Sequence, residues 1–228
     1  HPLRRRTVSL RSSTSSPRPS VRNVTDRISN PFGMEPPCDR FVPGYGDANA
    51  HFHVVGDHPG VHGGVGTGVP FTGTDAGRRL QRALHDAGLL RSIGDAPVVE
   101  NTYLSYLHTC VPDGDPTADD YAAMEPFFDA ELRAIAAHVL LPVGERAIRH
   151  VLETCTAHDT DGLDPATLHA TELLGSGWLV MPIRDPTAWE SDDGGRLVDA
   201  IGRLRSTDYR RESDLGRFVA GNEPYLVR

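Results

Sequence analysis

The 228-residue chain contains no lysine, so all 23 of its basic residues are arginines. It also has no apolar run approaching the roughly 18 residues that a membrane-spanning helix requires, and we therefore expect no membrane association. Its three cysteines, Cys38, Cys110 and Cys155, form no CxxC pair, so the sequence indicates neither a disulfide framework nor a zinc ribbon. Cytoplasm is accordingly the expected compartment.

Charge is distributed unevenly along the chain. The formal net charge is −8, and because residues 1–22 contribute six arginines and no acid, the remainder carries −14. This acidity, combined with the exclusive use of arginine, is typical of a salt-adapted organism. Residues 1–24 are rich in Ser and Arg and cannot bury a core, so we expect them to be an over-extended gene start or, alternatively, a transit peptide. The folded domain is assigned to residues 25–228.

Four short apolar segments, at residues 50–56, 102–110, 137–144 and 177–183, predict β-strands. Helical patterns lie between them at 74–90, 117–138 and 144–155, and Thr74 and Thr117 are expected caps. Strands that alternate with helices through short links indicate a parallel sheet covered on both faces. The predicted fold is a three-layer α/β/α sandwich with a central, mainly parallel four-stranded sheet.

The loop after the first predicted strand is the first candidate site, within "HFHVVGDHPGVHGGVGTGVPFTG" at residues 51–73. Asp57 and His58 stand where the strand ends, which is the edge at which such sheets bind ligands. The glycines, including Gly60, allow the backbone to approach a phosphate or a planar base closely. The loop lacks both GxGxxG and a P-loop. Two other interpretations stay open: His51 and His53 share a strand face and could bind a metal, or the loop histidines are simply solvated.

The order of five segments resembles the uracil-DNA glycosylase superfamily, especially its thermostable branches that contain an iron–sulfur cluster. The segments are "PGYGDANAHFHVVGDHPG", "GVPFTGTDAGRRLQRAL", "YLSYLHTCVP", "MEPFFDAELRAIAAHVLLPVGERAI" and "MPIRDPTAW". They follow one another at family spacing over about residues 30–190. The resemblance implies a protein that flips a damaged base out of DNA and hydrolyses its N-glycosidic bond.

The resemblance also implies roles for individual residues. Asp57, in place of a family glutamate, would stabilise the positive charge that develops on the sugar. Asp185 stands where the family has a histidine, and it could donate to the departing base only if protonated; His58 or His62 could substitute. Phe71 would stack on the base, Tyr106 replaces the asparagine that reads it, and Gly56 and Gly60 would border it.

DNA contacts and cofactors complete the predictions. Trp189, in the same loop as Thr187, would wedge into the base stack, and Arg146 at a helix N-terminus would hold a phosphate. Cluster-containing relatives use four cysteines, whereas this chain retains Cys38 and Cys110 and has Met124 in place of a third. We therefore expect no cluster, no metal and no other cofactor.

The predicted function is that of a monomeric DNA base-excision glycosylase acting on a deaminated base. The first alternative is a non-catalytic superfamily member that binds nucleic acid or a nucleotide through the same cleft. The second is a small metal-dependent hydrolase built on the histidines of the opening loop.

Overall fold

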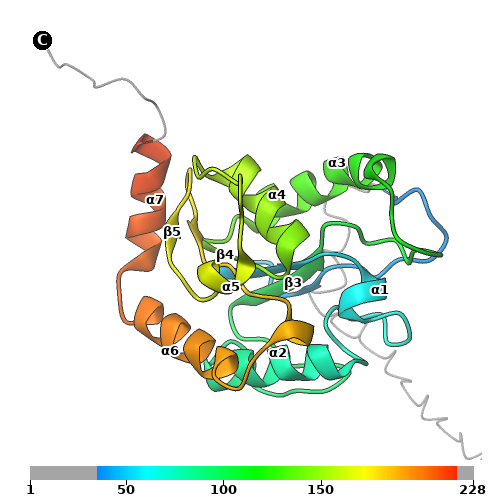
Figure 1. Cartoon of the computed structure of the whole chain (residues 1–228), viewed down its shortest axis with the longest axis horizontal. Helices are drawn as coiled ribbons and strands as arrows, with labels where there is room; N and C mark the ends of the chain where they lie inside the picture. Colours follow the sequence, from blue (N-terminus) through cyan, green and yellow to red (C-terminus); the bar gives the residue numbers. More distant parts are fainter. Residues whose placement is uncertain (1–34, 220–228) are drawn as a thin grey trace, which may run out of the picture.

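A six-stranded sheet forms the centre of the molecule (Figure 1). The computed structural model describes residues 35–219, so the predicted leader at residues 1–24 lies outside the described residues. The strands, in their order across the sheet, are β1 (Tyr45–Gly46), β3 (Thr102–Tyr106), β2 (Phe52–Gly56), β4 (Val139–Pro142), β6 (Leu179–Val180) and β5 (Leu173–Leu174). The four central strands are parallel, and β1 and β5 pair antiparallel at the two edges.

All four predicted strands are present, and together they form the parallel part of the sheet. The prediction of only four strands is wrong, because β1 and β5 extend the sheet at its edges. Each of these edge strands has two residues, which is too short to show the alternation of apolar and polar residues that identifies a strand in sequence.

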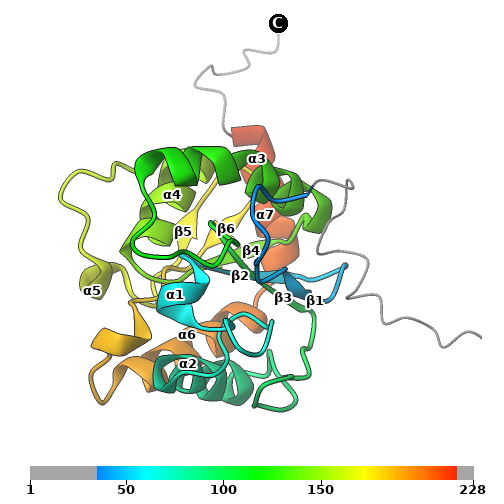
Figure 2. The ribbon, with the colours of Figure 1, turned by 90° about the vertical axis from the view of Figure 1, so that its right-hand side faces the viewer.

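Two pairs of helices cover the two faces of the sheet (Figure 2). Helices α2 (Asp75–Asp86) and α6 (Asp193–Arg205) pack on one face, and α3 (Ala118–Ile135) and α4 (Glu145–Cys155) pack on the other. Successive strand residues point to opposite faces, so Val54 joins the core beneath α2 and α6 while Val55 joins the core beneath α3 and α4. The three-layer α/β/α prediction is therefore confirmed.

Local sequence explains where the central helices begin. The side chain of Thr74 accepts a hydrogen bond from the backbone N–H of Gly77 at the start of α2. At the start of α3, Thr117 and Asp120 form a reciprocal capping box. Both caps were predicted. Two further helices, α6 and α7 (Tyr209–Val219), lie beyond the segments for which the sequence predicts helices.

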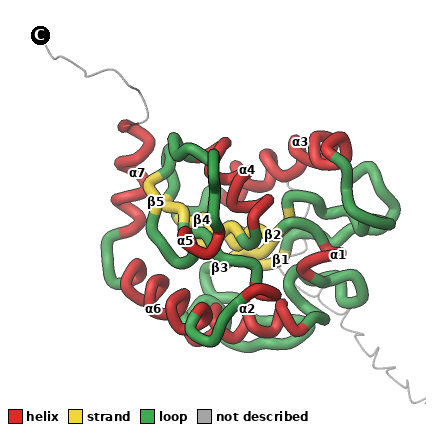
Figure 3. Tube along the Cα trace, viewed as in Figure 1, coloured by secondary structure: helices red, strands yellow, loops and turns green. Residues whose placement is uncertain are grey.

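Short helices and long connections surround the carboxyl ends of the parallel strands (Figure 3). They include α1 (Pro59–His62) after β2, α5 (Pro165–Leu168) before β5, and the 3₁₀ turn η2 (Pro186–Ala188) after β6. None of the helices among the described residues is both long enough and apolar enough to cross a membrane.

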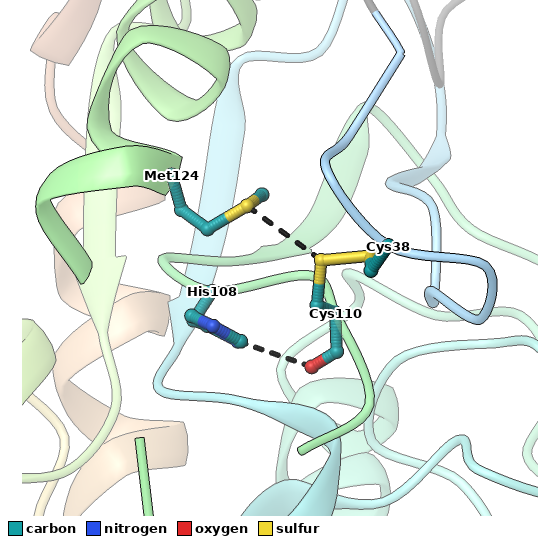
Figure 4. The surroundings of a disulfide bond; sticks show 4 residues. All are labelled: Cys38, His108, Cys110 and Met124. Atoms are coloured by element: carbon teal, nitrogen blue, oxygen red, sulfur yellow. Dashed lines mark hydrogen bonds between the residues drawn. A yellow bond between two sulfur atoms is a disulfide. The ribbon is translucent and has the colours of Figure 1, made fainter. Parts of the chain in front are cut away.

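A disulfide joins Cys38 to Cys110, which contradicts the sequence interpretation that no disulfide is indicated (Figure 4). The bond ties the first described segment to the connection between β3 and α3. The Cys110 sulfur also lies 3.7 Å from the Met124 sulfur of α3. Because a disulfide sulfur carries no proton, this is a packing contact. The two cysteines are 72 residues apart with no spacing signal, so only the fold reveals their pairing.

Candidate functional site

A polar cleft of about 420 Å³ opens at the carboxyl ends of β2, β4 and β6. This is the edge at which parallel α/β sheets bind ligands. The residues that line it come from the three segments that follow these strands: Asp57, His62, Gly144, Glu145, Arg146, Arg149 and Asp185. Asp57, Arg146 and Asp185 were predicted as site residues, and the structure brings all three to this one cleft.

Asp57 follows β2 directly and is held from two sides. The hydroxyl of Tyr121, on α3, donates a hydrogen bond to Asp57 Oδ1. The Nε atom of Arg146 lies 3.8 Å from Asp57 Oδ2, and its guanidinium lies over the Tyr121 ring at 4.1 Å from the centroid. Burial, followed by the neighbouring Asp57 carboxylate, raises the pKa of Tyr121, so the phenol stays protonated as a donor. One carboxylate oxygen of Asp57 thus has a fixed partner, and the other faces a cation.

His62 and Asp185 form a hydrogen-bonded pair in the same cleft. His62 Nε2 lies 3.1 Å from Asp185 Oδ2, and His62 Nδ1 accepts from the backbone N–H of Asp57 at 3.0 Å. Since Nδ1 accepts, we assign the proton to Nε2, which donates to the carboxylate. Burial alone would raise the pKa of Asp185, but hydrogen bonds from His62 and Thr187 lower it to about 2. Asp185 is therefore ionised at neutral pH and cannot act as a proton donor.

Phe71 and Tyr106 lie behind the cleft, in the hydrophobic core. Their side chains are 1% and 0% exposed. The His62 ring lies beside both, with centroid distances of 5.6 Å to Phe71 and 6.3 Å to Tyr106. Gly56 lies against both aromatic rings, since a Cβ at this position would meet the Phe71 and Tyr106 rings at 2.8 Å. The predicted base-contacting residues Gly56, Phe71 and Tyr106 therefore lie together, and they contact one another.

His58 and Gly60 serve the local structure of α1. His58 is the N-cap, and its Nδ1 accepts from the backbone N–H of Gly60 at 3.1 Å. The His58 side chain is buried, and this burial is the main cause that lowers its pKa. It does not line the cleft, whereas His62, one turn later, does.

The predicted DNA contacts after β6 separate into two places. Thr187 is exposed beside the cleft, and its N–H and hydroxyl both donate to Asp185 Oδ1, at 2.9 and 2.7 Å. Trp189 instead lines another groove, of about 580 Å³, between α2 and α6. Its indole N–H donates to the Arg184 carbonyl at 2.6 Å, and its ring packs beside His169. The wedge role of Trp189 stays a prediction.

The residues considered for metal or cluster binding have other partners. His51 Nδ1 lies 3.0 Å from the Tyr209 hydroxyl, and buried His53 Nε2 lies 2.7 Å from the Ser105 hydroxyl. Among the residues that the structure describes, no group of three or more His, Cys, Asp or Glu is arranged to hold a metal ion. An iron–sulfur cluster requires thiolates, but Cys38 and Cys110 are bonded to each other and the third position is a thioether. These residues do not fit a cluster.

The fold and the cleft define the class: an α/β/α protein with a carboxylate and a His–Asp pair at the carboxyl edge of its parallel strands. A sequence model of the Uracil DNA glycosylase superfamily matches residues 43–193. The chain therefore belongs to this superfamily.

Relatives of the chain agree with this assignment. The chain is 35% identical to a Type-5 uracil-DNA glycosylase of Pyrobaculum aerophilum, over 72% of this chain and 74% of the relative. It is 34% identical to a protein of the same name from Thermus thermophilus, over 53% and 58% of the two chains. A third such relative, from Mycobacterium leprae, is 32% identical over 47% of this chain and 50% of its own.

Sequence reasoning missed several residues of the cleft. The resemblance names His62 as a possible substitute for Asp185 as a donor, but the sequence does not show that the two side chains pair. Tyr121 comes from α3, 64 residues after Asp57, and nothing in the sequence marks it as a hydrogen-bond partner of Asp57. Glu145 and Arg149 lie one helical turn apart on α4, where their ion pair, at 3.2 Å, looks like an ordinary surface pair in sequence.

Proposed function

We propose that this chain binds DNA through the cleft, with one nucleotide entering between Asp57 and the His62–Asp185 pair. The observation that carries this proposal is the position of Arg146, whose exposed guanidinium lies in the first turn of α4, at the cleft that also holds Asp57. A helix N-terminus and an arginine together favour a phosphate. The names of the relatives, all uracil-DNA glycosylases, support DNA as the partner.

The acidic surface does not prevent such binding. Phosphate contacts dominate DNA affinity, but a local pair of arginines, Arg146 and Arg149, suffices to place one or two phosphates at the mouth of the cleft. With one or two phosphates contacted, the logarithm of the binding constant should fall with the logarithm of the salt concentration with a slope of about 1 to 2.

Arg146→Gln tests the DNA proposal, with Arg133→Gln as its matched control. Arg133 is an exposed arginine of α3 that pairs with Asp129 and does not line the cleft. Anisotropy titrations with a labelled duplex at several salt concentrations should show weaker binding for Arg146→Gln, with the salt slope reduced by about 1. Arg133→Gln should bind as the wild type does. If no DNA binds, or if both variants behave alike, the proposal is wrong.

Excision of a deaminated base is the second candidate, and the position of Asp57 favours it. Breaking the N-glycosidic bond leaves positive charge on the sugar, and a carboxylate at the mouth of the cleft can stabilise that charge and orient a water molecule. Because Asp185 is ionised, the His62 Nε2–H would donate to the departing base, and it would do so after leaving its hydrogen bond to Asp185. Incubating the protein with DNA that carries uracil, hypoxanthine or xanthine, followed by hot alkali to cleave the strand at any abasic site, tests this candidate. A strand that stays intact through the alkali step for all three bases would reject it.

A further inference from the structure

The Tyr106 side chain fills a flat slot directly behind the cleft. The His62 ring lies 6.3 Å away at an interplanar angle of 29°, on the cleft side, and the Phe71 ring lies 5.3 Å away at an interplanar angle of 63°. Gly56 lines the slot with bare backbone, because any side chain there would meet both aromatic rings. Aromatic rings and a glycine thus enclose one planar ring.

Polar backbone groups lie at the end of this slot. The Tyr106 hydroxyl donates to the Gly63 carbonyl and accepts from the Phe71 N–H, both at 2.8 Å. A buried donor and a buried acceptor each need a partner, and the phenol supplies both from a single atom. Without the phenol, the slot would suit a flat polar ring whose edge carries an acceptor and a donor, which describes a nucleobase.

We propose that Tyr106 occupies from within the chain the position of a flipped-out base, so that the cleft admits an abasic nucleotide in preference to one that carries a base. The inference rests on the proposed DNA binding. A base would have to displace the phenol and also the His62 ring, which is held at both nitrogens by Asp57 and Asp185. The sugar and phosphate of an abasic site require only the outer cleft, lined by Asp57, Arg146 and Arg149.

The wild-type protein provides the first test. Affinities are measured at one salt concentration for four duplexes that differ only at the central position, which is a tetrahydrofuran abasic analogue, uracil, hypoxanthine or an undamaged base. The abasic duplex should bind about threefold or more tightly than the other three. A base stacked in the slot would instead favour a base-bearing lesion by about fivefold or more. Equal affinity for all duplexes, or tighter binding of the uracil or hypoxanthine duplex, overturns the inference.

Emptying the slot provides the second test. Tyr106→Ala should bind free uracil or hypoxanthine, with a rise in melting temperature of about 2 °C or more at millimolar ligand. The wild type should show no such rise. Tyr103→Ala is the matched control, because Tyr103 is an equally buried tyrosine of β3 that donates to Glu131 on the opposite face of the sheet. Both variants should take p-cresol, the analogue of the deleted side chain, but only Tyr106→Ala should take the bases.

The outcomes separate this inference from the proposed function. Absence of any DNA binding rejects the proposed function, and the free-base experiment then decides the role of Tyr106 by itself. Stabilisation of the wild type by free uracil, or absence of any base binding by Tyr106→Ala, overturns the inference even where DNA binds. If Tyr106→Ala does not fold, the comparison of the four duplexes on the wild type decides.

Discussion

The imidazole of His62 donates to the carboxylate of Asp185 across 3.1 Å, and this pair joins α1 to the turn that follows β6. The two residues are 123 positions apart, and the carboxyl edge of the sheet brings them together. Since His62 also accepts from the Asp57 backbone, the ring is fixed by the segments that follow two different strands. The pair therefore positions the wall of the cleft and also contributes to stability.

Asp185→Asn should lower the free energy of unfolding at pH 7 by about 1–2 kcal/mol. The folded-state pKa of Asp185 is about 2, below its ordinary value of 3.8, so the carboxylate stabilises the fold above about pH 4. This contribution is lost as the pH falls toward 2, where the carboxyl is protonated in both states. Denaturant unfolding at pH 7, 4 and 2.5 should therefore show the difference between wild type and variant shrinking at low pH. Asp199→Asn, at an exposed position of α6, is the control, and a difference that does not depend on pH would contradict the assignment.

Asp57→Ala should lower any base-excision rate by roughly 10²-fold or more, as expected for a positioned charge stabiliser. The fold should survive, because Asp57 is at the surface of the cleft and a Tyr121 hydroxyl left without it can reach water. Single-turnover excision assays give the rate, and circular dichroism checks the fold. Asp57→Asn keeps the shape without the charge and should behave in the same way. Wild-type rates in both variants would assign the chemistry to another group.

Phe71→Ala should lower the free energy of unfolding by about 3–5 kcal/mol, the usual cost of removing a buried phenylalanine. Phe71 contacts both His62 and Tyr106 and belongs to the core beneath α2 and α6. Phe128→Ala, in the other core, should cost a similar amount. Neither change should alter the affinity of the folded protein for the abasic duplex. A loss of affinity for the uracil or hypoxanthine duplex without a loss of stability, seen only for Phe71→Ala, would instead support base stacking.

The sequence sufficed for the parts of the site that follow directly from strand ends. Asp57 and Asp185 each come after a predicted strand, so their meeting at one edge could be predicted from chain order alone. Which of His58 and His62 lines the cleft could not be predicted in this way. It depends on which residue caps α1 and which residue faces the cleft one turn later. The burial of Tyr106 could not be predicted either, because its hydroxyl bonds to backbone groups of a loop about 40 residues away in sequence.

Reduction of the Cys38–Cys110 disulfide should lower the free energy of unfolding by about 2–4 kcal/mol, because the bond closes a long loop in the unfolded chain. The Cys38→Ser/Cys110→Ser double variant should show the same loss and should no longer respond to dithiothreitol. Denaturant unfolding with and without the reductant measures both effects.

We also expect the purified protein to be colourless and to contain no stoichiometric iron. Iron bound in proportion to protein would show that these cysteines hold a cluster.

A buried acid on the opposite side of the sheet from Tyr106 leads to the last prediction. Glu131 of α3 is 6% exposed, accepts from the Tyr103 hydroxyl at 3.0 Å, and approaches His53 to 4.0 Å. Burial lowers the pKa of His53 to about 3, so the imidazole is neutral and this approach is not an ion pair at neutral pH. Burial, only partly offset by hydrogen bonds from Ser105 and Tyr103, raises the pKa of Glu131 to about 7.

Glu131→Gln should therefore stabilise the protein at pH 8 and change little at pH 4.5. Below about pH 4.5 the carboxyl is protonated in both states; between about 4.5 and 7 the unfolded chain loses the proton while the folded protein keeps it, so wild-type stability falls as the pH rises. Above pH 7 the cost is at most about 3 kcal/mol, and glutamine, which is neutral and still accepts from Tyr103, removes it. Denaturant unfolding from pH 4.5 to 8 compares the wild type, Glu131→Gln and the exposed α3 control Glu125→Gln. A variant curve parallel to that of the wild type would mean that Glu131 is already ionised in the fold.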